Sequence, residues 1–95
     1  MKRLVVSAAA RADLRNIARY SRREWGKSRA RQYLELIRAR FANLRHWPEQ
    51  GPLRTDIGLP YRAVLAGRHV VFYTVEGDAI LIVRGLHQRM DVVLH

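Results

Sequence analysis

The final third of the chain carries the apolar pattern of a β-sheet. β-Branched and aromatic residues form three runs, at residues 61–65, 68–75 and 79–86, which are separated by short connections containing Gly67 and Gly77. Connections of this length and composition close antiparallel hairpins, so the pattern predicts a three-stranded meander. The third run is apolar at consecutive positions, which indicates that both of its faces are covered and that it lies inside the sheet.

The first half of the chain has the 3.6-residue periodicity of two amphipathic helices. We predict the first helix at residues 8–25 and the second from residue 29 to residue 46 or 47. Their apolar stripes are Ala10, Leu14, Ile17, Ala18, Ser21 and Trp25 on the first helix, and Ala30, Tyr33, Leu34, Ile37, Phe41 and Leu44 on the second.

Residues that commonly cap or stop helices mark the ends of both segments. Ser7 and Ser28 stand where N-caps are expected, Gly26 follows the last turn of the first helix, and Pro48 stops the second. The very short connection between the helices predicts an antiparallel helical hairpin.

The remaining segments complete an α+β domain. Residues 2–6 predict a short opening strand, which must join the sheet because a lone strand is not stable, although the sequence leaves its neighbour open. Residues 48–60 hold all three prolines and two of the six glycines, so they predict a loop. The predicted order is β-α-α-β-β-β, with the helical hairpin packed on one face of a small, mainly antiparallel sheet.

Length and composition narrow the class of protein. The 95 residues have the size of one domain, residues 1–95, and the absence of cysteine excludes disulfides and thiolate ligands. The four histidines lack paired ligand spacing, so we predict neither a metal nor another cofactor. No run approaches the about 20 apolar residues of a membrane span, and we expect a soluble cytoplasmic protein that does not contact a membrane.

The charge balance predicts an anionic partner. Lysine and arginine number 18 against 8 acidic residues, a formal net charge of +10, and 16 of the 18 are arginine. Candidate partners are nucleic acid, an acidic protein and anionic lipid, and arginine favours bidentate pairing with carboxylate or phosphate. A solvated basic surface without a dedicated partner is the alternative.

Short motifs follow one another in a fixed order along nearly the whole chain. They occupy residues 4–14, 20–26, 47–49 with Gly51, 61–62, 67–73, 82–84 and 86–91. In this order and spacing they resemble the ParE toxins of the RelE/ParE superfamily, from bacterial toxin–antitoxin systems.

The resemblance implies a toxin that a cognate ParD-like antitoxin neutralises by wrapping it with its C-terminal segment. ParE-like toxins poison DNA gyrase and trap it on cleaved DNA, whereas RelE-like relatives cut messenger RNA in the ribosomal A site. The toxin would meet DNA indirectly, through the antitoxin. Both activities share one fold, so the fold alone does not choose between them.

The residues favour the gyrase activity, which is not enzymatic. RelE-like members carry a basic residue before the Val-Tyr strand, but Val70 stands there in this chain, so that cation is missing unless Arg68 or His69 substitutes. Only His87 and Arg89 remain as chemical groups near the last strand for a ribosome-dependent mRNA endonuclease. A third hypothesis is an inactive relative that survives as an antitoxin-binding module.

His87, Arg89 and Met90 are the candidate target-binding residues, because they follow the central strand. The alternative has His87 bonded to the backbone and Arg89 paired with Asp91. Alternation places Arg84 and His87 on opposite faces of the strand, so they are not expected to share a site unless a bulge intervenes.

The candidate antitoxin-binding residues are basic, to match a partner rich in Asp and Glu. They are Arg11, Arg15, Arg19, Arg38 and Arg68.

Four aromatic residues invite comparison with the stacking platforms that bind single-stranded nucleic acid. They are Tyr20, Trp25, Tyr33 and Trp47. The helix stripes instead predict that most of them pack in the core or within the helical hairpin.

Overall fold

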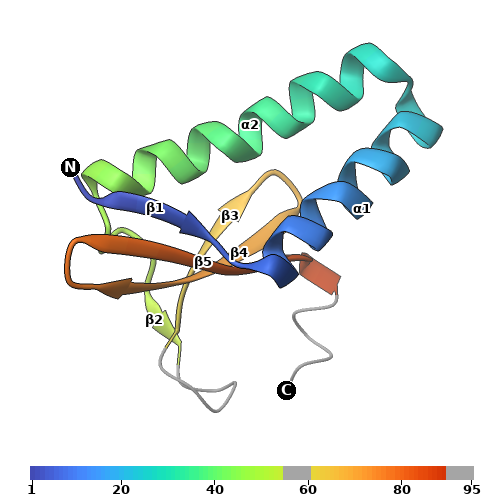
Figure 1. Ribbon diagram of the computed structural model, residues 1–95. Helices are drawn as coiled ribbons and strands as arrows, with labels where there is room; N and C mark the ends of the chain where they lie inside the picture. The colour runs from blue at the N-terminus through green and yellow to red at the C-terminus, as the bar shows by residue number, and fades with distance from the viewer. Residues whose placement is uncertain (55–60, 90–95) are drawn as a thin grey trace.

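Two helices cover one face of a five-stranded sheet in the computed structural model, which describes residues 1–54 and 61–89 (Figure 1). The predicted α+β class is confirmed. The elements are β1 (Arg3–Val6), α1 (Ala8–Trp25), α2 (Lys27–His46), β2 (Leu53–Arg54), β3 (Tyr61–Ala66), β4 (His69–Glu76) and β5 (Ala79–His87).

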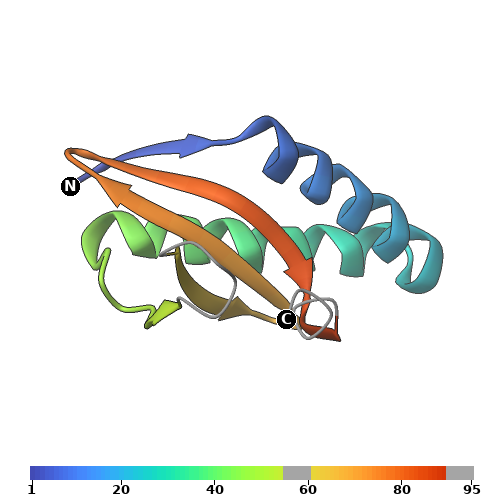
Figure 2. The same ribbon diagram turned by 90° about the horizontal axis from the view of Figure 1, so that it is seen from below.

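The sheet order is β1-β5-β4-β3-β2, so β5 is an internal strand, as its continuous apolar run predicted (Figure 2). The predicted meander is present, since β3, β4 and β5 pair antiparallel in sequence order. The opening strand β1 pairs parallel with β5, with Arg3 opposite Ala79 and Val6 opposite Ile82. This pairing supplies the neighbour that the sequence left open.

One strand lies inside the segment predicted as a loop. β2 contains only Leu53 and Arg54, which pair with Arg62 and Tyr61 of β3. The loop prediction was therefore wrong at these two residues. A two-residue strand has no alternation to detect, and its pairing depends on β3 rather than on its own sequence.

Gly26 joins the two helices directly. Its φ of 86° lies in the left-handed region that glycine tolerates, and its N–H donates to the carbonyl of Arg22 at 3.0 Å, which ends α1. The second helix begins at Lys27, and its N-cap position is Gly26 without a side-chain cap. The prediction that Ser28 caps α2 was therefore wrong, whereas Ser7 caps α1 by accepting from the N–H of Ala10 at 3.0 Å.

The main core lies between the helical hairpin and the sheet. Ile37, Phe41 and Leu44 of α2 pack there with Ile80 and Ile82 of β5, and all five are buried. A smaller buried cluster contains Ala63, Val70, Phe72 and Leu86. The two clusters draw on alternate residues of β3, so they mark the two faces of the sheet.

Three of the four aromatic residues weighed as stacking rings are exposed, so the prediction that most of them are packed internally was wrong. The exposed fractions are 54% for Tyr20, 40% for Trp25 and 62% for Trp47, while Tyr33 is partly buried against the core. Periodicity placed Trp25 on the buried stripe, but the tip of the hairpin extends past the sheet (Figure 1). A stripe residue in that last turn has no sheet beneath it.

The segment after α2 is fixed by a buried tyrosine of β4. The Tyr73 hydroxyl donates to the carbonyl of Pro48 at 2.7 Å and accepts from the N–H of Gly51 at 3.1 Å. Burial raises the pKa of Tyr73 above its ordinary value. None of the helices in the described ranges is long and apolar enough to cross a membrane.

Candidate functional site

A bulge in β5 determines which side chains meet at the end of the sheet. Phe72 pairs with Arg84 while Tyr73 pairs with Ile82, so Val83 is an additional residue on β5. A bulge reverses the faces of the residues that follow it. His87 consequently lies opposite His69, on the sheet face that carries Ile82. Arg84 also follows the bulge, so no bulge lies between Arg84 and His87, yet both residues line one pocket. The prediction that they do not share a site was therefore wrong, because the Arg84 side chain reaches Asp13 of α1.

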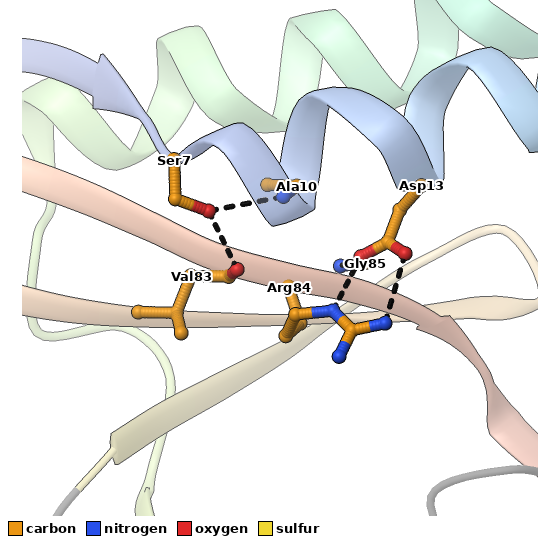
Figure 3. Close-up of polar contacts among 6 residues, drawn as sticks. All are labelled: Ser7, Ala10, Asp13, Val83, Arg84 and Gly85. Carbon is orange, nitrogen blue, oxygen red and sulfur yellow. Dashed lines mark hydrogen bonds and ion pairs between the residues drawn. The ribbon is translucent and has the colours of Figure 1, made fainter.

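The first turns of α1 are fastened to this bulge (Figure 3). The Ser7 hydroxyl donates to the carbonyl of Val83 at 2.8 Å. The Asp13 carboxylate accepts two bonds from the Arg84 guanidinium, at 2.8 and 3.0 Å, and a third from the N–H of Gly85 at 2.9 Å. These bonds raise the pKa of Arg84 and neutralise its charge against Asp13.

A pocket of about 440 Å³ opens beside this anchor. We call it the aromatic pocket. It is lined by Asp13, Asn16, Ile17, Tyr20, Ser21, Trp25, Tyr33, Arg68, His69, Arg84, Gly85, Leu86 and His87.

Four rings form a continuous series along this pocket. The ring centroids lie 5.6 Å apart for Trp25 and Tyr33, 5.6 Å for Tyr33 and His69, and 5.4 Å for His69 and His87. The series joins the exposed tip of the hairpin to the end of β5. It combines helix and strand residues that are distant in sequence.

Hydrogen bonds engage the Nδ1 atom of both imidazoles. The Tyr33 oxygen accepts from the N–H of Arg68 at 2.9 Å and shares a hydrogen bond of 2.6 Å with His69 Nδ1, in which we assign the tyrosine as the donor. His87 Nδ1 accepts from the N–H of Arg89 at 3.2 Å. Burial, reinforced by His87, lowers the pKa of His69 to about 4, so this imidazole is neutral at pH 7 and carries its proton on Nε2.

Of the predicted target-binding residues, His87 lies at one end of this pocket. His87 lines the pocket, and its bond to the backbone agrees with the alternative that we weighed for it. Arg89 is exposed. Met90 lies outside the described residues, as does the Asp91 proposed as a partner for Arg89.

The predicted antitoxin-binding arginines do not form one surface. Arg68 lines the aromatic pocket, whereas Arg38 lines a groove of about 260 Å³ between the helices. We call this the cationic groove, since Arg22, Lys27 and Arg31 also line it and no acidic residue of the described ranges does. The exposed residues Arg11, Arg15 and Arg19 of α1 line neither.

Asp13 and Tyr33 were not predicted as site residues. Asp13 bonds to residues 71 and 72 positions away, and the Tyr33 hydroxyl meets residues 35 and 36 positions away. Tyr33 was assigned to the apolar stripe and weighed only as one of four possible stacking rings, and Asp13 appeared only within a motif. In the described ranges, no group of three or more His, Cys, Asp or Glu is placed to hold a metal ion.

Residues 4–92 match a family model described as the ParE toxin of the type II toxin–antitoxin system parDE. The chain belongs to the ParE toxin family. The match covers both helices and the sheet from the second residue of β1 onward, so the family resemblance found in the motifs is confirmed. A ParDE system implies an antitoxin partner.

Curated relatives that carry the ParE name match over more than nine tenths of their length. Toxin ParE1 of Caulobacter vibrioides is 36% identical over 95 residues, which cover 100% of this chain and 98% of the relative. Toxin ParE1 of Mycobacterium tuberculosis is 37% identical over 91 residues, covering 95% and 93%. Toxin ParE of Escherichia coli is 34% identical over 96 residues, covering 98% and 91%.

A solved structure supports the fold. It is described as the chromosomal ParDE TA system from P. aeruginosa, and it superposes with a TM-score of 0.79 over 92% of this chain and 96% of that chain. At 23% sequence identity, this likeness concerns the fold alone.

Proposed function

We propose that this ParE toxin inhibits DNA gyrase by binding it and that a cognate ParD-like antitoxin neutralises the toxin in the cytoplasm. The observation that carries the proposal is the family match over residues 4–92, together with relatives at 34–37% identity along the whole chain. The proposed contacts with gyrase are His87, Arg89 and Met90.

The charge distribution supports an acidic antitoxin. The net charge is +10, and the candidate residues Arg11, Arg15, Arg19, Arg38 and Arg68 are all exposed. Because these arginines lie on α1, on α2 and in the connection between β3 and β4, an extended partner that wraps the toxin would meet more of them than a compact one. DNA would then be reached through the antitoxin.

The endonuclease alternative has less support among the described residues. Cleavage through a 2′-hydroxyl needs a base with a free nitrogen or oxygen. His69 and His87 both use Nδ1 in local hydrogen bonds, and their Nε2 atoms carry protons when the rings are neutral. The pair therefore offers donors rather than a general base.

A supercoiling assay with purified gyrase tests the proposed target. We expect added toxin to inhibit supercoiling, and the double variant His87→Ala with Arg89→Ala to inhibit less. Arg29→Ala is the matched control, because it removes an exposed arginine of α2 that lines neither the aromatic pocket nor the cationic groove. This variant should inhibit supercoiling as strongly as the original chain does. Undiminished supercoiling at a large excess of toxin contradicts the proposal.

Expression without the antitoxin separates the three functional hypotheses in cells. Growth arrest accompanied by a DNA-damage response indicates trapped gyrase. Arrest without that response, with message cleavage that disappears in Arg89→Ala, indicates the endonuclease. Unaffected growth indicates an inactive antitoxin-binding module.

A further inference from the structure

Two side chains of the aromatic pocket leave a large part of their rings exposed to solvent. Tyr20 and Trp25 are 54% and 40% exposed, although each has a large apolar ring. Trp25 meets Tyr33 edge to face, with the ring planes at 72°. This arrangement leaves much of the indole surface available for a flat apolar ligand.

The other end of the pocket offers hydrogen-bond donors. The Nε2–H groups of His69 and His87 are not used by their Nδ1 bonds. Arg68 is exposed, and no ion pair engages its guanidinium within the part of the chain that the structure describes. Asp13, the one carboxylate among the described residues of the lining, is already paired with Arg84.

We propose that the aromatic pocket binds a nucleotide, with its base stacked on Trp25 and Tyr20 and its phosphate held by Arg68 and the two imidazole N–H groups. The volume of about 440 Å³ lies within the range of small-molecule sites. Stacking on aromatic rings tolerates any base, and phosphate oxygens are acceptors that match a site made of donors. This activity goes beyond gyrase inhibition and does not depend on it.

The nucleotide could be free or part of a single strand, since both present a base beside a phosphate. An acidic peptide would also use the donors, but an Asp or Glu side chain has no flat apolar surface to place against the exposed rings. The ring series therefore favours a nucleotide over a carboxylate alone.

Calorimetry on the purified full chain tests the proposal with adenosine monophosphate, adenosine and a short single-stranded oligodeoxyadenylate. We expect saturable binding of the monophosphate and about tenfold or more weaker binding of adenosine, because the charge-assisted bonds to phosphate are lost. In a Trp47→Phe chain, where Trp25 is the remaining tryptophan, bound base should quench the fluorescence.

Matched variants separate the two ends of the pocket. Arg68→Ala should weaken binding about tenfold or more, whereas Arg29→Ala, with the same change of charge on α2, should not. Trp25→Leu should weaken binding roughly fivefold or more, whereas Trp47→Leu, at an exposed tryptophan outside the pocket, should not. Arg68→Lys retains the charge and should recover part of the affinity, and thermal melts verify that each variant is folded.

The outcomes also identify the source of the nucleotide. Binding of the oligonucleotide alone, with the same dependence on Arg68 and Trp25, assigns the site to single-stranded nucleic acid, and binding of the monophosphate assigns it to free nucleotide. Equal losses in Arg68→Ala and Arg29→Ala indicate diffuse attraction and overturn the proposal. The proposal is also overturned if neither the monophosphate nor the oligonucleotide binds. The same holds if an Asp- and Glu-rich peptide binds in the pocket and saturating nucleotide does not displace it. None of these results alters the supercoiling test.

Discussion

Asp13 and Asp78 each pair with an arginine, yet the two carboxylates have very different surroundings. The Asp13 side chain is 11% exposed and accepts a backbone N–H in addition to Arg84. The Asp78 side chain is 78% exposed, and its contact with Arg3 is longer, at 3.4 Å. Only the first pair holds a helix against a strand.

We predict that Asp13→Asn lowers the free energy of unfolding by about 1–3 kcal/mol, because it removes a charge-assisted pair and leaves Arg84 without its counter-charge. Asp78→Asn is the matched control and should change it by less than about 0.5 kcal/mol, as exposed ion pairs usually do. Urea unfolding measures both values. Equal effects would mean that the Asp13 contacts do not stabilise the junction of α1 and β5.

His69 makes the stability of the fold depend on pH. Its pKa is about 4 in the folded chain, below the ordinary value of 6.5, because burial and the nearby His87 disfavour the charged ring. The unfolded chain therefore takes up this proton first as the pH falls. Its contribution to stability is present above pH 6.5 and is lost between about pH 6.5 and pH 4.

We predict that His69→Asn reduces the difference in unfolding free energy between pH 7.5 and pH 5, because asparagine does not titrate. His46→Asn, at an exposed position near the end of α2, is the control and should retain the difference. Urea unfolding at the two pH values provides the measurement. A pH dependence that is the same in His69→Asn and in the original chain contradicts this account of His69.

At the scale of elements, two serines that look alike in the sequence have different roles. Ser7 accepts from the N–H of Ala10 and donates to the carbonyl of Val83, so it caps α1 and fastens the cap to β5. Ser28 lies within the first turn of α2, after the helix has begun at Lys27. Ser28 cannot be the N-cap because Gly26 is the only residue between the helices, so α2 has already begun before Ser28.

We predict that Ser7→Ala destabilises the chain by about 1–2 kcal/mol, the usual cost of a lost N-cap. Ser28→Ala should change stability by less than about 0.5 kcal/mol, because no cap is removed. Thermal unfolding of the two variants under the same conditions compares them directly. A larger effect at Ser28 than at Ser7 would contradict the assigned helix boundaries.

The sequence predicted the elements whose apolar pattern extends over many residues. The apolar stripes located both helices, and the run 79–83 correctly indicated an internal strand. The sequence did not predict β2 or the bulge at Val83, because a two-residue strand and one additional residue produce no periodic signal. The parallel pairing of β1 with β5 depends on tertiary packing, so the sequence of neither strand predicted it.

The candidate site was only partly predictable for the same physical reason. His87 and Arg68 were identified singly, as a strand-end histidine and a basic residue, and assigned to different partners. The bulge and the hairpin β4–β5 bring them into one pocket. The Asp13 contact that neutralises Arg84 spans 71 residues, so no local pattern could have revealed it.

At the scale of the whole molecule, a large positive net charge is carried by a small protein. The chain has a net charge of +10 and a radius of gyration of 13.1 Å. At about 10 mM salt the Debye length is about 30 Å, so charges across the entire molecule repel one another, whereas at about 150 mM it is about 8 Å. The same screening that relieves this repulsion also weakens attraction to an acidic partner.

We predict that raising sodium chloride from about 10 to about 150 mM changes two properties in opposite directions. The free energy of unfolding of the isolated chain should rise, because self-repulsion in the compact state is screened. The association rate with an acidic antitoxin should fall by about tenfold or more, because electrostatic steering is lost. Urea unfolding, which adds no ions, measures the first, and stopped-flow mixing measures the second. If the association rate does not depend on salt while stability rises, the surplus arginines do not steer the antitoxin, and its binding depends on uncharged contacts.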